Sequence, residues 1–137
     1  MPRSPLRLKR RAQFLAVARA GRRVPADGFA MQAMARADGG PVRVGYTATR
    51  KLGNSVVRNR ARRRLREVAR LALGERAVVG VDIVLLGRPA TRTLPFPLLL
   101  AEFHRALDRL DQSGPRRGRG ADHQGHEIDR ENQGGPR

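Results

Sequence analysis

The segment from Arg43 to Glu67 constrains the fold of this chain more than any other part of the sequence. Apolar and polar side chains alternate over 42–49, which predicts a half-buried strand. A basic turn that contains Gly53 follows, and beyond it the pattern becomes helical. A helix that starts directly after a strand can pack one side on the sheet and present the other outward. The segment therefore predicts a strand, a tight turn and an amphipathic helix.

The helical part of this segment is dense in arginine. At about 100° per residue, one side carries the apolar set Val57, Ala61, Leu65, Val68 and Ala72. Another side carries Arg58, Arg62, Arg66 and Arg70, with Asn59 and Arg63 beside them and Arg60 and Arg64 at the opposite edge. Like charges at i, i+4 spacing repel by roughly 0.2–0.5 kcal/mol per pair. This density favours a phosphate-binding surface over an ordinary solvated one, because guanidinium forks match phosphate oxygens.

The overall charge points to the same class of partner. The chain has 29 Lys and Arg against 12 Asp and Glu, a net charge of +17. Such an excess implies salt-sensitive binding to nucleic acid or to an anionic membrane. No apolar run reaches the roughly 20 residues of a membrane span, no secretory signal is visible, and there is no cysteine. We therefore expect a cytoplasmic protein without membrane association.

The N-terminal half supplies a helix and a strand before the central segment. A helix is predicted over 8–20, with Gly21 expected as a left-handed C-cap. A strand is predicted over 28–36. The sequence Asp38-Gly39-Gly40-Pro41 is a hairpin turn signal between this strand and the next.

The C-terminal half supplies a second helix, a strand and a third helix. The arginine-rich helix is expected over 55–73, with Ser55 as N-cap and Gly74 closing it. The apolar run 77–87 fits a buried central strand. After a loop at 88–90, helical spacing predicts a helix over 97–111.

The order α-β-β-α-β-α predicts a single small α+β domain over 8–111, with helices packed on a small central sheet. Residues 1–7 form a basic lead-in. Residues 112–137 are almost free of large apolar side chains, so they cannot offset the entropy of ordering and are predicted to be a disordered tail.

Individual residues leave several alternatives open. The turn before the arginine-rich helix could hold a phosphate at the helix N-terminus, or Gly53 could simply allow a positive-φ turn. Phe14 is expected in the core more readily than stacked on a base, and Tyr46 likewise. His104 has no partner at metal-ligand spacing. No nucleophile with its base and no paired carboxylates can be assembled, so no catalytic residue and no protein metal site are predicted.

The segment 51–66 resembles the protein subunit of bacterial ribonuclease P. The resemblance rests on Gly53, the Arg58-Asn59-Arg60 triplet and the following Arg62-Arg63 and Leu65-Arg66 pairs. It extends from Leu8 to Leu110 through Arg11, Phe14 and Val17 and through the segment 82–90.

This resemblance implies a function and a set of partners. The family acts with a catalytic RNA subunit to remove the 5′ leader of precursor tRNA by Mg²⁺-dependent endonucleolytic hydrolysis, so the chain would be the protein component of an endoribonuclease that matures tRNA. The RNA subunit would carry the chemistry and hold most of the Mg²⁺. The protein is expected to be a monomer within the ribonucleoprotein, and the fold to contain a left-handed β-α-β crossover.

The resemblance also assigns residues to two sites. The RNA subunit would be bound by Arg58, Asn59, Arg60, Arg62, Arg63, Arg66 and Arg70. The single-stranded leader would be bound by Phe14, Lys51, Arg50 and Arg11. In this light Phe14 is expected to be partly exposed.

Two departures from the family pattern are visible. Many members carry aromatic residues where this chain has Ala18 and Gln32, so leader stacking is expected to be weaker and electrostatic attraction relatively more important. Two other classes of function remain alternatives. A structural RNA-binding protein would not distinguish precursor from mature tRNA, and a DNA-compacting basic protein would prefer duplex DNA.

Overall fold

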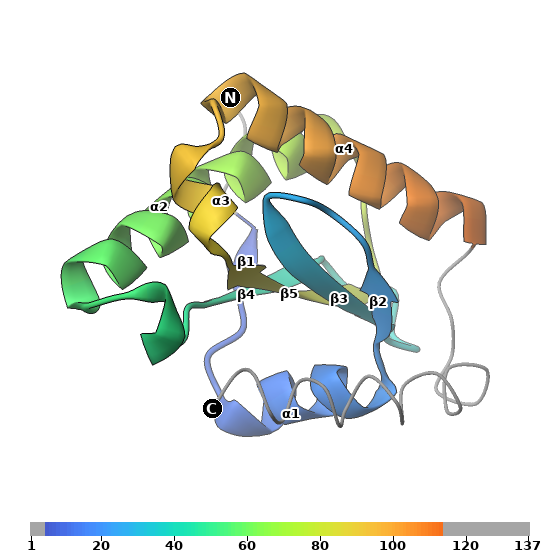
Figure 1. The fold of residues 1–137 in the computed structure, drawn as a ribbon. Helices are drawn as coiled ribbons and strands as arrows, with labels where there is room; N and C mark the ends of the chain where they lie inside the picture. The colour runs from blue at the N-terminus through green and yellow to red at the C-terminus, as the bar shows by residue number, and fades with distance from the viewer. Residues whose placement is uncertain (1–4, 114–137) are drawn as a thin grey trace.

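The computed structural model describes residues 5–113. Its elements are β1 (Leu6–Arg7), α1 (Arg11–Ala20), β2 (Arg22–Val24), β3 (Phe29–Ala35), β4 (Arg43–Thr47), the 3₁₀ turn η1 (Arg50–Leu52), α2 (Ser55–Glu75), β5 (Val81–Gly87), α3 (Pro89–Thr93) and α4 (Phe96–Ser113). Over these residues five strands form one mixed sheet in the order β1-β4-β5-β3-β2. Helix α1 covers one face, and α2, α3 and α4 lie on the other (Figure 1). The predicted α+β class is confirmed.

The long elements were predicted and the short ones were missed. The three predicted strands correspond to β3, β4 and β5, and the three predicted helices to α1, α2 and α4. Strands β1 and β2 are too short for alternation to reveal them, and β1 falls in the predicted lead-in. The loop expected at 88–90 instead opens α3, where Pro89 occupies the first turn and the Thr91 hydroxyl accepts a hydrogen bond from the Arg88 N–H at 2.9 Å. The first two residues of the predicted tail, 112 and 113, belong to α4, and from residue 114 onward the tail lies outside the described residues.

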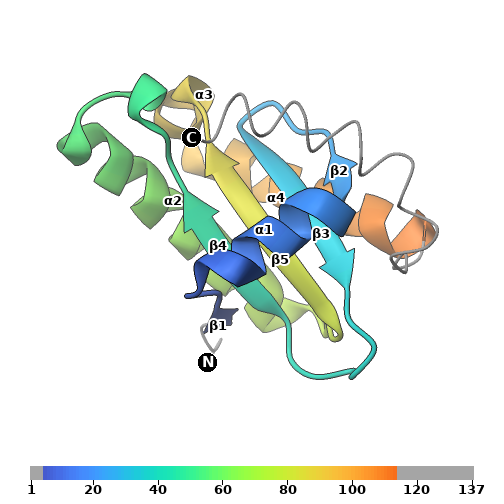
Figure 2. The same ribbon diagram turned by 90° about the horizontal axis from the view of Figure 1, so that it is seen from below.

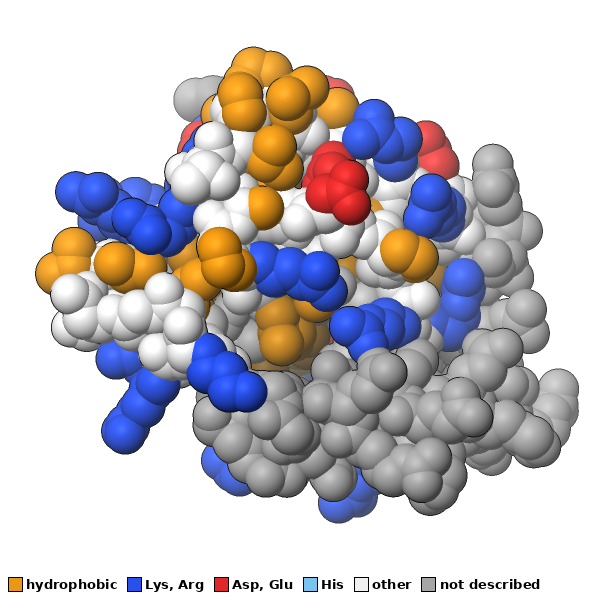
Figure 3. Space-filling model, viewed as in Figure 1, with side chains coloured by type: hydrophobic (Ala, Val, Ile, Leu, Met, Phe, Trp, Pro, Cys, Tyr) orange, Lys and Arg blue, Asp and Glu red, His pale blue; other side chains and the backbone are white. Residues whose placement is uncertain are grey.

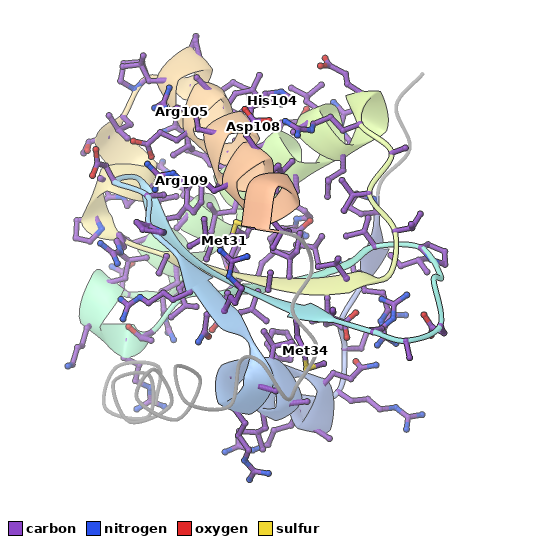
Figure 4. The ribbon with its side chains drawn as sticks, turned by 90° about the vertical axis from the view of Figure 1, so that its right-hand side faces the viewer. Met31, Met34, His104, Arg105, Asp108 and Arg109 are labelled. Carbon is purple, nitrogen blue, oxygen red and sulfur yellow. The ribbon has the colours of Figure 1, made fainter. Side chains whose placement is uncertain are left out.

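The main core lies between the sheet and the α2–α4 layer. Its largest fully buried side chains include Phe29, Met31, Leu65, Leu85 and Phe103. A second, smaller cluster of Leu8, Val17 and Val84 lies on the α1 side. Figure 4 shows the alternation along β3, because Met31 points toward α4 and Met34 toward α1. Both faces of the sheet are therefore covered, but unequally.

The hairpin predicted at 38–41 is wrong, because β5 lies between β3 and β4. β5 pairs antiparallel with β3 and parallel with β4. Asp82 of β5 is 1% exposed and connects β5 to both neighbouring strands. Its carboxylate accepts hydrogen bonds from Arg36, beyond the end of β3, at 2.6 Å and from Arg43 of β4 at 2.8 Å. A buried carboxylate needs such partners, and the central position of β5 places Asp82 beside both.

Strands β4 and β5 are parallel neighbours joined through α2. Figure 2 views the sheet from the α1 side: β4 and β5 both run upward, β5 lies to the right of β4, and α2 passes behind them. This arrangement is a left-handed β-α-β crossover, the reverse of the usual hand. The resemblance implied this feature, and the periodicity of the sequence gave no sign of it.

Three predicted helix ends are corrected. The N-cap of α2 is Asn54 rather than Ser55, since the Asn54 side chain accepts a hydrogen bond from the Val57 N–H at 3.0 Å. α2 also continues past Gly74 to Glu75. Gly21 ends α1 with φ −81°, which is not left-handed. A Cβ there would lie 2.4 Å from the Val17 carbonyl oxygen, so close backbone approach explains the glycine.

Candidate nucleic-acid interface

Helix α2 separates its apolar and basic residues, but of the predicted arginine row only Arg66 is exposed, whereas Arg58, Arg62 and Arg70 are half-buried. Ala61, Leu65, Val68 and Ala72 are buried against the core, together with Ala69, while Val57 is half-buried. Arg60, Arg63 and Arg66 are exposed. In Figure 3, a group of Lys and Arg side chains lies on the left of the molecule, where α2 lies, and others lie across the centre and right. The sheet thus fixes a helix whose outward side is strongly positive.

Neighbouring side chains engage part of this basic surface. Arg62 donates a hydrogen bond to Asn59 Oδ1, and Arg70 forms an ion pair with Glu67. The hydrogen bond from Arg70 lowers the pKa of Glu67, and the same contact raises the pKa of Arg70. The half-buried Arg58 has a buried Nε with no hydrogen-bond partner among the described residues.

Arg64 hydrogen-bonds the backbone of the neighbouring helix α3, whereas Arg62 and Arg70 hydrogen-bond side chains of α2 itself. Its Nη1 donates to the carbonyl oxygens of Thr91 at 2.9 Å and Arg92 at 2.8 Å. Its guanidinium carbon also lies 5.9 Å from the centroid of the Phe96 ring. Arg64 therefore ties α2 to α3 and α4.

On the opposite face of the sheet, Phe14 lies against β4. It is half-buried beside the Leu8–Val17–Val84 cluster. A Cβ built on Gly45 would come within 2.4 Å of Phe14 Cε2 and 2.6 Å of Cζ. Gly45 thus makes room for the ring, and the expectation of a partly exposed Phe14 is confirmed.

The other predicted leader-binding residues are exposed but dispersed. Arg11 begins α1, whereas Arg50 and Lys51 lie in η1, just after β4 ends. Figures 1 and 2 both show η1 apart from α1. The structure therefore places these residues at two ends of a stretch of surface and does not gather them into one compact pocket.

A groove that was not predicted lies where α2 meets the β1–β4 edge of the sheet. It has a volume of about 330 Å³ and is lined by Pro5, Arg7, Tyr46, Arg63, Arg66, Glu67 and Arg70. Tyr46 packs on the main core as expected, yet it also forms part of this wall. Arg7 was missed because it belongs to the supposed lead-in. Because β1 has only 2 residues, alternation could not indicate this position.

The described residues contain neither a metal-binding cluster nor a membrane-spanning helix. No cluster of three His, Asp or Glu side chains in this part of the chain could hold a metal ion. His104 instead lies near Arg76, whose Nη1 donates to the His104 carbonyl oxygen at 3.2 Å. None of the helices described is long and apolar enough to cross a membrane.

Fold and surface together define a class: a small α+β domain, with a sheet covered on both faces and an arginine-rich helix suited to a polyanion. The family model for ribonuclease P matches residues 1–111. The chain belongs to this family, as the protein component of a bacterial ribonuclease P, an endoribonuclease of tRNA processing.

Relatives and solved structures agree with this assignment. The ribonuclease P protein component of Gluconacetobacter diazotrophicus is 49% identical over 108 residues, covering 79% of this chain and 93% of that protein. The ribonuclease P protein component of Ruegeria pomeroyi is 47% identical over 111 residues, covering 79% of this chain and 88% of that protein. The RNase P protein structure from Thermotoga maritima has a TM-score of 0.66 at 25% identity, covering 77% of this chain and 97% of that one. The RNase P protein structure from Staphylococcus aureus has a TM-score of 0.64 at 22% identity, covering 77% of this chain and 94% of that one, and supports the fold.

Proposed function

We propose that this protein binds two RNAs on two different surfaces. The outward side of α2 holds the catalytic RNA subunit of ribonuclease P, and the α1 face of the sheet holds the single-stranded 5′ leader of precursor tRNA. By holding both, the protein promotes endonucleolytic removal of the leader and formation of the mature 5′ end. The observation that carries this proposal is the separation of the exposed α2 arginines from the half-buried Phe14 by the thickness of the sheet.

The α2 surface is suited to a folded RNA backbone. Arg60, Arg63 and Arg66 have no hydrogen-bond acceptor among the described residues, so their donors are available to phosphate oxygens. Their planar forks can each contact two oxygens at once. Their helix is anchored by buried side chains and by Arg64, so the surface is preformed and binding requires little ordering of the backbone.

The α1 face is suited to an unpaired strand. Phe14 presents part of its ring beside β4, and an aromatic ring can stack on any base. Arg11 on one side and Arg50 and Lys51 on the other can attract the phosphates of a strand that extends across the surface. Because Ala18 and Gln32 offer no further ring, electrostatic attraction is expected to supply much of the affinity.

Mg²⁺ would be held mainly by the RNA subunit and would supply the hydrolytic chemistry there. The side chains of this protein bind and position the two RNAs. The positive charge of the protein also offsets the repulsion between the phosphates of the two RNAs. This lowers the Mg²⁺ concentration that assembly needs.

The test is removal of the 5′ leader from a precursor tRNA by a bacterial ribonuclease P RNA at low Mg²⁺, with and without the protein. We expect cleavage at the mature 5′ end only when the protein is present. The double variant Arg60→Gln/Arg63→Gln should lose most of this effect. Its matched control is Arg105→Gln/Arg109→Gln, which removes the same charge from α4 (Figure 4) and should retain the effect.

If the protein binds both RNAs but leaves cleavage unchanged, the structural RNA-binding alternative is correct. If the two double variants lose activity equally, total charge matters and the α2 surface does not.

A further inference from the structure

The groove between α2 and the β1–β4 edge contains more positive charge than its surroundings balance. Four arginines line it, Arg7, Arg63, Arg66 and Arg70, and the single acidic side chain is Glu67. Glu67 is paired with Arg70. The other three arginines have no carboxylate or carbonyl partner among residues 5–113. Such a group of cations around one hollow is suited to an anion.

Tyr46 makes this groove more than a patch of charge. Its ring comes from β4 and is half-buried against the main core, so its position is fixed. Burial raises the pKa of Tyr46 to about 12, while the charges of Arg7 and Arg66 act in the opposite direction. The phenol is therefore neutral at physiological pH and can donate a hydrogen bond. The guanidinium groups of Arg7 and Arg66 lie close enough to Tyr46 to lower its pKa.

The size of the groove indicates what kind of anion fits. Its volume of about 330 Å³ is at the lower end of the roughly 300–1,000 Å³ typical of pockets for small organic ligands. A free phosphate group would leave most of it empty. A nucleotide could place its phosphate among the arginines and its sugar or base against Tyr46.

We propose that this groove binds one unstacked nucleotide of the catalytic RNA subunit. The groove is continuous with the basic side of α2, since Arg63 and Arg66 belong to both. It opens on the α2 side of the sheet, whereas Phe14 lies on the α1 side. These positions favour the RNA subunit over the leader as the source of the nucleotide. This inference rests on the proposed function of α2.

The test uses the sole tyrosine of the chain as a reporter. Full-length protein labelled with fluorotyrosine gives one ¹⁹F resonance, from Tyr46. We expect that resonance to shift when the RNA subunit is added and to stay in place when precursor tRNA alone is added. A shift with precursor tRNA alone would overturn the assignment to the RNA subunit.

A variant of Arg7 supplies an independent measurement. Arg7→Gln leaves α2 intact and is expected to weaken binding of the RNA subunit about tenfold, the effect of losing one good charged contact. The dependence of log affinity on log salt concentration should become shallower by about 0.7, as for one single-strand phosphate contact. Arg105→Gln on α4 is the control with the same change in charge.

The outcomes separate this inference from the function on which it rests. If the RNA subunit binds tightly, yet the Tyr46 resonance stays in place and Arg7→Gln behaves like Arg105→Gln, the groove is not a nucleotide site while the proposed function stands. If the RNA subunit does not bind the unmodified protein, the proposed function fails, and the inference with it.

Discussion

The two faces of the sheet differ in how they are covered and in what they expose. On one face, α2 and α4 bury a large core that includes Leu65 and Phe103, and α2 turns a dense row of arginines outward. On the other, the single helix α1 covers a cluster of three buried residues and leaves Phe14 half-exposed. A thick, rigid layer is suited to a permanent partner. A thinner layer with an accessible ring is suited to a substrate strand that must leave.

The largest expected effect concerns stability. Leu65→Ala should lower the free energy of unfolding by about 3 kcal/mol, because Leu65 is fully buried in the main core. A sharper comparison uses two fully buried valines, Val68 on α2 and Val17 on α1. Val68→Ala should cost more than Val17→Ala, since the small cluster under α1 can relax around a cavity more easily. Urea unfolding of the three variants measures this, and equal losses for the two valines would show that the faces are equally rigid.

The next effect concerns assembly. Arg60→Gln should weaken binding of the RNA subunit by about 10- to 100-fold, because a hydrogen bond to a charged group is worth roughly 1.5–3 kcal/mol. Filter binding at fixed salt concentration measures the affinity. Arg105→Gln is the control, and a comparable loss in that variant would contradict a specific role for α2.

A smaller effect should follow from Gly45→Ala. The new methyl group would lie 2.4 Å from the Phe14 ring, so the ring must move off the sheet. The preference for precursor over mature tRNA should fall by about fivefold or more, since stacking on an aromatic ring contributes roughly 1–3 kcal/mol per base. The double variant Gly45→Ala/Phe14→Ala should be no worse than Phe14→Ala alone. Additive losses would mean that Gly45 acts independently of Phe14.

The smallest expected effect concerns the dependence of stability on pH through Tyr46, and it is absent at neutral pH. Burial raises its pKa to about 12 in the folded protein, against about 10 in an unfolded chain. The folded state therefore retains the proton more tightly. The associated stability is complete below pH 10 and is lost as the pH rises from about 10 to 12. The tyrosinate absorbance of this sole tyrosine follows the titration, and Tyr46→Phe should lose less stability over that range. A folded-state midpoint near 10 would show that the ring is solvated.

Sequence patterns predicted the elements that are long and strongly periodic. The apolar side of α2 and the buried run in β5 were both identified, because burial imposes a period on many consecutive residues. The order of the strands in the sheet was not predicted. The turn at 38–41 has hairpin residues, but β5, far along the chain, lies between the two strands, and its Asp82 pairs with Arg36 and Arg43. A pairing between distant residues leaves no local pattern.

The candidate site was predictable to a similar extent. The α2 arginines were proposed as a phosphate-binding surface because charge and helical spacing coincide. The same pattern did not separate Arg64, which hydrogen-bonds the α3 backbone, from the arginines that remain available. Arg7 and Tyr46 were missed as neighbours of these arginines, because the groove is formed by β1, β4 and α2 together. The position of Gly45 under Phe14 also depends on the packing of α1 across the sheet.

The central claim is that the two faces bind two different RNAs, and one comparison tests it most directly. The affinities of the reconstituted ribonucleoprotein for precursor and mature tRNA would be measured with Phe14→Ala and Arg60→Gln, together with the affinity of each variant for the RNA subunit. We predict that Phe14→Ala reduces the preference for the precursor and leaves assembly unchanged, and that Arg60→Gln weakens assembly and leaves the preference unchanged. Loss of both properties in both variants would contradict the assignment of separate roles to the two faces.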